Sequence, residues 1–271
     1  MRVRTRATPS AADLTPRRTG DTKLDLFEFF ATIERYHTIQ NPTSEEKLDL
    51  AIRYCGVRDG MRILDVGCGK GWLLRRLAGR LDIHVTGLEI YPTFAAEARR
   101  LAAAENLTDR IQIVEGPALD FRAEPASFDV VMCIGALFAL GGFEPALDWM
   151  GHAAKRGGAI ALGEVFAKEL PYPPEVPRGG RADLDYPERS LLTTVETMRA
   201  RGMPLRGLVE ASVDDWDRYH SLHWQAGMDW ALEHPGDPDA VKVTDPAGMR
   251  LDLLDRRYCG WAIFVARNGM D

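Results

Sequence analysis

The residues best suited to chemistry form one short run, Asp65-x-Gly67-x-Gly69-x-Gly71. Glycine tolerates positive φ angles and lets a ligand approach the backbone closely. Apolar, β-prone residues at 63–66 precede the glycines, and residues 72–81 continue at a helical period. The run therefore predicts a strand, a glycine-rich loop and a helix N-terminus, whose exposed amides favour an anionic group.

A second carboxylate, Glu89, lies at the end of the next predicted strand. A carboxylate at this position of an α/β sheet accepts hydrogen bonds from the ribose hydroxyls of a nucleoside cofactor. Both NAD and S-adenosylmethionine (SAM) carry such a ribose. Glu89 therefore predicts a nucleoside cofactor without choosing between the two.

The glycine spacing distinguishes the two cofactors. The dinucleotide fingerprint G-x-G-x-x-G would place its third glycine at position 72, which is Trp72. The spacing instead resembles motif I of the class I SAM-dependent methyltransferases. This resemblance implies that the loop passes under the methionine end of SAM and that Asp65 helps to hold its ammonium group.

The same resemblance implies a wider cofactor site along the carboxyl ends of the strands. Many of these enzymes carry an adenine-binding acid after strand three, but Pro117 stands at that place here. We expect Ala118 with backbone groups, or Asp120, to hold the adenine. The predicted cofactor-binding residues are Tyr36, Asp65, Gly67, Cys68, Gly69, Gly71, Glu89, Ile90, Pro117, Ala118 and Cys133.

Hydrophobic patterning predicts an α/β fold, a doubly wound sheet of seven mostly parallel strands. Strands are expected at 63–66, 84–90, 110–115, 128–134, 159–165, 205–213 and 260–266. Helices are expected at 24–37, from a capping box at 43–46 onward, and at 72–81, 92–106, 143–154 and 188–201, with Gly157 and Gly158 after the helix at 143–154. The family resemblance implies that the last strand enters antiparallel.

The chain is expected to hold one methyltransferase domain, at 21–271, after a disordered tail at 1–20. Within it, residues 21–57 should form an N-terminal helical cap. The proline-rich stretch at 167–187 reads as a lid loop, with a plain linker as the alternative. Residues 214–257 read as a helical insertion before the last strand.

Composition limits the partners. A formal net charge of −6 gives no general attraction to nucleic acid or to an anionic membrane. No apolar run approaches the length of a membrane span, and no secretory signal follows the N-terminal arginines. The four cysteines form no CxxC pair, which argues against a zinc site and for a reduced, cytoplasmic protein. The protein is expected to be a monomer or a homodimer. We therefore expect no bound metal, nucleic acid or membrane.

Segments outside the glycine loop resemble an uncharacterised bacterial branch of small-molecule SAM methyltransferases. They are the stretches at 133–143, 163–166, 216–219 and 260–261. Residues 133–136 lack the Asn- or Asp-Pro-Pro-aromatic motif of enzymes that methylate base amino groups, and no proline precedes Cys133 as in the RNA cytosine-C5 enzymes. We therefore expect a small-molecule acceptor and no covalent catalysis.

Methyl transfer is an in-line displacement at an already activated methyl group, so the protein chiefly aligns the acceptor and excludes water. A hydroxyl or ammonium acceptor also needs a base. The candidate catalytic residues are His37, Glu164, His220 and His223. We expect O- or N-methylation; the alternatives are an NAD(P)-dependent oxidoreductase and a non-catalytic SAM-binding protein.

An aromatic stripe in the insertion indicates where the acceptor binds. Trp216, Tyr219, His220, His223 and Trp230 recur at helical spacing and share one face. A core stripe would explain the aromatic residues, but buried histidines need hydrogen-bond partners. We expect His220 or His223 to face the acceptor, with Glu164 and Tyr36 nearby.

Overall fold

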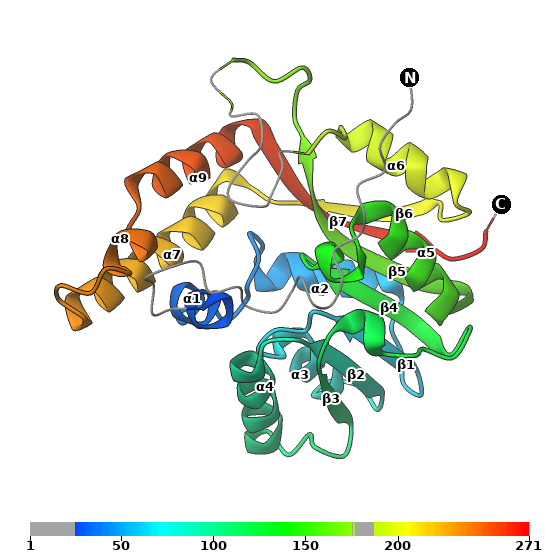
Figure 1. The fold of residues 1–271 in the computed structure, drawn as a ribbon. Helices are drawn as coiled ribbons and strands as arrows, with labels where there is room; N and C mark the ends of the chain where they lie inside the picture. Colours follow the sequence, from blue (N-terminus) through cyan, green and yellow to red (C-terminus); the bar gives the residue numbers. More distant parts are fainter. Residues whose placement is uncertain (1–24, 175, 177–186, 271) are drawn as a thin grey trace.

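A central sheet with helices on both faces organises the molecule (Figure 1). The computed structural model describes residues 25–174, 176 and 187–270. The predicted tail at 1–20 lies outside these residues, and so does much of the predicted lid at 167–187.

The sheet has seven strands in the order β3-β2-β1-β4-β5-β7-β6. They are β1 (Arg62–Val66), β2 (His84–Glu89), β3 (Ile111–Glu115), β4 (Phe128–Ile134), β5 (Ala154–Ala167), β6 (Leu205–Glu210) and β7 (Cys259–Arg267). All neighbours pair in parallel except at β7, which runs antiparallel to both β5 and β6. The predicted doubly wound sheet with an antiparallel last strand is confirmed. The strand order reverses between β1 and β4, so their carboxyl ends flank the crevice where such sheets bind ligands.

Helices cover both faces of the sheet, which is why its strands lack a polar alternation. One face packs with α2 (Glu45–Cys55), α3 (Trp72–Ala78) and α4 (Pro92–Ala104), and the other with α5 (Phe143–Ala153) and α6 (Leu191–Ala200). Neighbouring residues of β1 point to opposite faces. Ile63 packs in the core on the side of α2, α3 and α4, and Leu64 packs in the core on the side of α5 and α6. Short 3₁₀ turns, η1 (Ala118–Asp120) and η2 (Leu137–Leu140), follow β3 and β4.

The remaining helices lie beside the sheet (Figure 1). They are α1 (Leu26–Ile33), α7 (Val213–Glu233), α8 (Ala240–Val243) and α9 (Pro246–Tyr258). The helix α7 contacts α1, α8 and α9, so α1 packs on the insertion that precedes β7. Within the described part of the chain, no helix combines the length and apolarity that crossing a bilayer requires.

Two predicted helix boundaries near the N-terminus were wrong. Helix α1 ends at Ile33, so Tyr36 and His37 lie in the turn that follows it. The N-cap of α2 is Ser44, whose hydroxyl accepts a hydrogen bond from the backbone N–H of Lys47. A capping box would need an acid at position 47. The predicted box at 43–46 was therefore one residue out of register.

Two strand boundaries also differ from the prediction. Strand β5 begins at Ala154, directly after α5, so Gly157 and Gly158 lie within the strand where its pairing with β4 is irregular. Strand β6 ends at Glu210, before 213, because Ser212 caps the start of α7. Both differences arise because tertiary pairing and capping override the glycine and β-propensity signals.

Phe264 on β7 is one of the largest fully buried side chains and is 0% exposed. The substitution Phe264→Ala should lower the free energy of unfolding by about 3–5 kcal/mol, because it leaves a cavity between sheet and helices. Urea titration followed by circular dichroism measures this change. Phe138, which is 54% exposed, is the matched control. Equal losses in Phe264→Ala and Phe138→Ala would contradict the placement of the core.

Candidate active site

The glycine loop between β1 and α3 is held by backbone contacts and by one carboxylate. The N–H groups of Gly67 and Cys68 both donate to the carbonyl of Leu88 at the end of β2, at 2.8 and 3.0 Å. Glu89 Oε2 accepts from the N–H of Gly69 at 2.8 Å, and its Oε1 accepts from the N–H of Tyr91 at 2.8 Å. Glu89 therefore fixes the loop directly.

Asp65 lies beside Glu89 in the same buried site. Only 3% of Asp65 and 5% of Glu89 is exposed. Burial, with the nearby charge of Glu89, raises the pKa of Asp65 to about 8. Burial also raises the pKa of Glu89, against the opposing effect of its backbone hydrogen bonds. Two acids in one buried place favour a cationic ligand, because a positive charge would hold Asp65 ionised.

The three glycines of the motif serve different purposes. A Cβ on Gly67 would lie 2.4 Å from Cβ of Ala136, and one on Gly69 would lie 2.2 Å from Oε1 of Gln40. A Cβ on Gly71 would instead meet Ala98 of α4 at 3.0 Å. Gly71 is the N-cap of α3, with φ +72°. Gly71 therefore allows α3 and α4 to pack closely, and its predicted contact with the cofactor stays a prediction.

Residues 34–41, here called the N-terminal cover, lie over the glycine loop. Lys70 Nζ donates to the carbonyls of Glu34 and His37, at 2.7 and 2.8 Å, and so satisfies carbonyls at the end of α1. The backbone N–H of Lys70 donates to Gln40 Oε1 at 3.0 Å, and Asn41 Nδ2 donates to the carbonyl of Ile134 at 3.0 Å. Lys70, Gln40 and Asn41 were not predicted, because none carries a motif signal.

A cavity of about 60 Å³ lies between the cover and the loop, lined by residues 38–41 on one side and by Asp65, Gly67, Cys68 and Gly69 on the other. Small-molecule sites measure at least about 300 Å³. This cavity is smaller, and its lining includes only the Asp65 and glycine-loop part of the predicted cofactor site. The chemistry of these residues suits SAM. The buried Asp65 suits an ammonium group. At Gly69 the backbone already accommodates a polar atom, Gln40 Oε1, in the space that a Cβ would fill.

The other predicted cofactor residues divide between the crevice and the core. The N–H of Gly116 donates to the carbonyl of Glu89 at 2.9 Å, which brings the turn at Pro117 beside the end of β2 and the half-buried Ile90. Ala118 is buried in the core and Asp120 is exposed.

Cys133 is 0% exposed, and burial raises the pKa of its thiol. A deeply buried neutral thiol is a poor nucleophile, in line with the expectation that covalent catalysis is absent.

Of the four predicted catalytic residues, the structure brings His37 and His223 together, whereas His220 and Glu164 have other partners. His220 is buried against Asp252 of α9, with Nε2 3.9 Å from Oδ1. His223 and His37 both contact Glu34. Tyr36 is 41% exposed, and its hydroxyl donates to Asp229 of α7 at 2.8 Å. The aromatic stripe of α7 therefore packs against two different helices, α1 and α9.

Glu164 lies apart from the histidines, beside the end of β4. It follows Gly163, whose carbonyl accepts from the N–H of Gly135 at 3.0 Å. Its Oε1 accepts from the N–H of Val165 at 2.7 Å. Burial raises the pKa of Glu164, and the nearby charge of Arg189 only partly opposes this rise. By contrast, burial lowers the pKa of His37 to about 4.

Comparison with known proteins supports the resemblance seen in the sequence. A family model described as "Methyltransferase domain" matches residues 63–158. A SAM-dependent methyltransferase from Thiobacillus denitrificans, solved with S-adenosyl-L-homocysteine, has a TM-score of 0.79 at 28% identity, covering 88% of this chain and 97% of that one. The uncharacterized protein YjhP of Escherichia coli is 28% identical over 249 residues, covering 89% of this chain and 98% of YjhP.

A third relative has a named substrate. Erythromycin 3''-O-methyltransferase from Saccharopolyspora erythraea is 31% identical over 126 residues, which cover 44% of this chain and 39% of that enzyme. The present chain thus matches less than half of that enzyme, whereas it spans nearly the whole of YjhP and of the Thiobacillus protein.

The raised pKa of Asp65 makes cofactor binding depend on pH. Below a pKa of about 8 the free carboxyl is protonated, so a cationic cofactor must displace its proton. The affinity for SAM should therefore rise between pH 6 and pH 7, by up to about tenfold per pH unit. Calorimetry at several pH values measures this slope. The exposed Asp109 is the control: Asp109→Asn should keep the slope and Asp65→Asn should lose it. A flat profile in the unsubstituted protein would contradict the role of Asp65.

Proposed function

We propose that this chain, which is a class I SAM-dependent methyltransferase, methylates an oxygen or nitrogen atom of a small-molecule acceptor. The main support is the glycine loop with its two buried acids, in a fold shared with a relative that binds S-adenosyl-L-homocysteine. The Saccharopolyspora enzyme, an O-methyltransferase that by its name acts on erythromycin, supports a small acceptor. The net charge of −6 disfavours a nucleic-acid acceptor.

The residues of the loop position the cofactor. When bound, SAM supplies a methyl group activated by the positive charge on its sulfur. Asp65 would hold the ammonium group, and Glu89 would accept hydrogen bonds from the ribose hydroxyls. The N-terminal cover would exclude water from the methyl group, because its side chains already bond to the loop and to the end of β4.

We assign the general base to Glu164. An acceptor lone pair forms the new bond to the methyl carbon while the carbon–sulfur bond breaks toward sulfur, and the acceptor's proton must leave. A base works best when its pKa lies near the working pH, and burial shifts Glu164 in that direction. The histidines are less suited, because His220 packs against Asp252 and His37 and His223 contact Glu34.

A screen for S-adenosylhomocysteine release tests the proposed function. Phenols, sugar hydroxyls and amines, each supplied with SAM, form the acceptor panel. Turnover on one class supports the proposal and names the acceptor atom. Stoichiometric SAM binding without turnover on any acceptor would favour the alternative, a non-catalytic SAM-binding protein. An NAD(P)-dependent enzyme is disfavoured because Trp72 replaces the third glycine of the dinucleotide fingerprint.

The role of Glu164 gives a kinetic prediction. Glu164→Gln should lower kcat by about 10²–10⁴-fold, because it removes a general base, and should leave SAM affinity unchanged. In the unsubstituted enzyme, kcat/KM should fall as pH drops through the raised pKa of Glu164, since the base is then protonated. The exposed Glu169 is the control, and Glu169→Gln should keep full activity. Full turnover in Glu164→Gln would overturn the assignment.

A further inference from the structure

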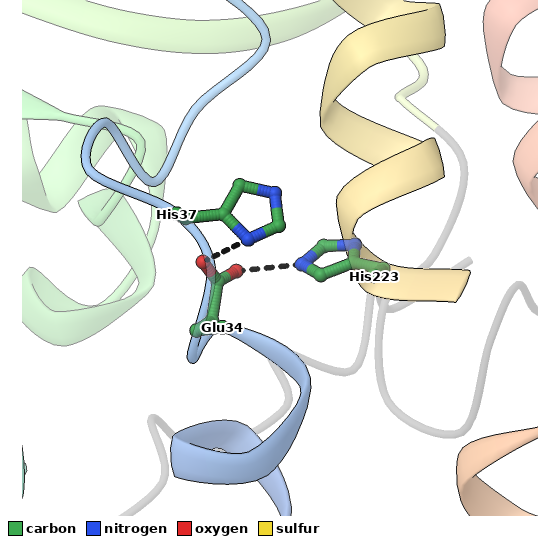
Figure 2. A group of neighbouring side chains, drawn as sticks. All are labelled: Glu34, His37 and His223. Atoms are coloured by element: carbon green, nitrogen blue, oxygen red, sulfur yellow. Dashed lines mark hydrogen bonds and ion pairs between the residues drawn. The ribbon is translucent and has the colours of Figure 1, made fainter. Parts of the chain in front are cut away.

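A buried cluster of one carboxylate and two imidazoles joins α1 to α7 (Figure 2). Glu34 lies at the end of α1 and His37 in the following turn, while His223 comes from the middle of α7. Glu34 is 5% exposed and His37 is 2% exposed. The two rings pack against each other with their centroids 4.5 Å apart, and Glu34 directs one oxygen to each of them (Figure 2).

The hydrogen bonds of His37 fix which of its nitrogens carries the proton. Its Nε2 lies 3.0 Å from the backbone carbonyl of Tyr219, and a carbonyl only accepts, so Nε2 must donate. In the neutral ring Nδ1 then has a bare lone pair. That lone pair lies 3.3 Å from Glu34 Oε2, which is also an acceptor. Neither atom has a hydrogen-bond partner among the described residues.

Two buried acceptors that face each other require a positive species between them. We propose that Glu34, His37 Nδ1 and His223 Nε2 bind a divalent transition-metal ion of the zinc class. One ligand atom from each residue lies within 4.8 Å of the other two. Ligands about 2.1 Å from a tetrahedral Zn²⁺ are about 3.4 Å apart, close to the 3.3 Å between His37 Nδ1 and Glu34 Oε2.

The surroundings of the cluster have the features of a metal site. Ligating histidines commonly donate their second N–H to a backbone carbonyl, as His37 does to Tyr219. His223 Nε2 bonds to Glu34 Oε1 at 2.8 Å, and the metal would replace the proton between them. Two nitrogens and one carboxylate suit Zn²⁺, Co²⁺ or Fe²⁺ better than Mg²⁺ or Ca²⁺. Lys70 Nζ, which bonds to the carbonyls of Glu34 and His37, adds a nearby positive charge that opposes any cation. The three ligands must therefore bind the metal strongly.

A metal at this site would hold the N-terminal cover against α7. Its ligands come from residues 34 and 37 on one side and from α7 on the other. Because Lys70 also binds the carbonyls of Glu34 and His37, the metal would connect α7 to the glycine loop through this segment. The sequence does not indicate this site, because His223 lies 189 residues from Glu34 in the chain.

Metal titration tests the site directly. Full-length protein without an affinity tag is stripped with a chelator and titrated with Zn²⁺ by calorimetry, and bound zinc is counted by mass spectrometry. We expect saturable binding of one Zn²⁺ per chain. His223→Gln keeps a donor toward Glu34 but removes the ligand, so it should weaken binding at least about tenfold. The exposed histidine at the start of β2 gives the control, and His84→Gln should bind as the unsubstituted chain does.

Two results would overturn the site: the absence of saturable binding, or equal affinity in His223→Gln and the unsubstituted chain. Amide hydrogen exchange gives a second readout that needs no variant. Zn²⁺ should slow exchange in Leu26–Ile33 and Val213–Glu233, because the metal joins these helices. Binding of Zn²⁺ without slowing in either helix would place the ion elsewhere and would also reject the proposal.

Discussion

The burial of two acids at the adjoining ends of β1 and β2 is the constraint on which the site depends. Removing a carboxylate from water costs several kcal/mol unless other groups compensate. Backbone N–H groups of Gly69 and Tyr91 compensate Glu89, and so tie the glycine loop to β2. Asp65 is instead kept from ionising, with a pKa of about 8. A cationic cofactor supplies the missing compensation, which couples the stability of the loop to its occupant.

The N-terminal cover extends this constraint to the rest of the molecule. Lys70 emerges from the glycine loop and binds the carbonyls at the end of α1. Glu34 and His37 in turn contact α7, while Asn41 bonds to the end of β4. The cover therefore contacts the loop, β4 and α7 at once, and a change in one of these contacts would affect the others. This arrangement connects the insertion before β7 to the cofactor although the two are far apart in the chain.

The chemistry we propose for the acceptor uses a separate region. Glu164 lies beyond the carboxyl end of β4, on the same core face as α5 and α6, whereas the histidines lie between α1, α7 and α9. The carboxylate proposed to take the proton is thus distinct from the carboxylates proposed to hold the cofactor. Such a separation lets burial tune the pKa of each group independently.

The sequence alone predicted the strands of the sheet from local periodicity. It predicted the cofactor class from one glycine motif that is contiguous in the chain, and the family resemblance carried by that motif implied the antiparallel last strand. The tertiary structure decided what depends on packing between distant segments. It packed Gly71 against Ala98 of α4, gave His220 and His223 different partners, and brought Glu34 to His223 across 189 residues. A motif reports only on residues that are close in the chain. The contact between α1 and α7 depends on side chains from distant segments, so no local pattern could predict it.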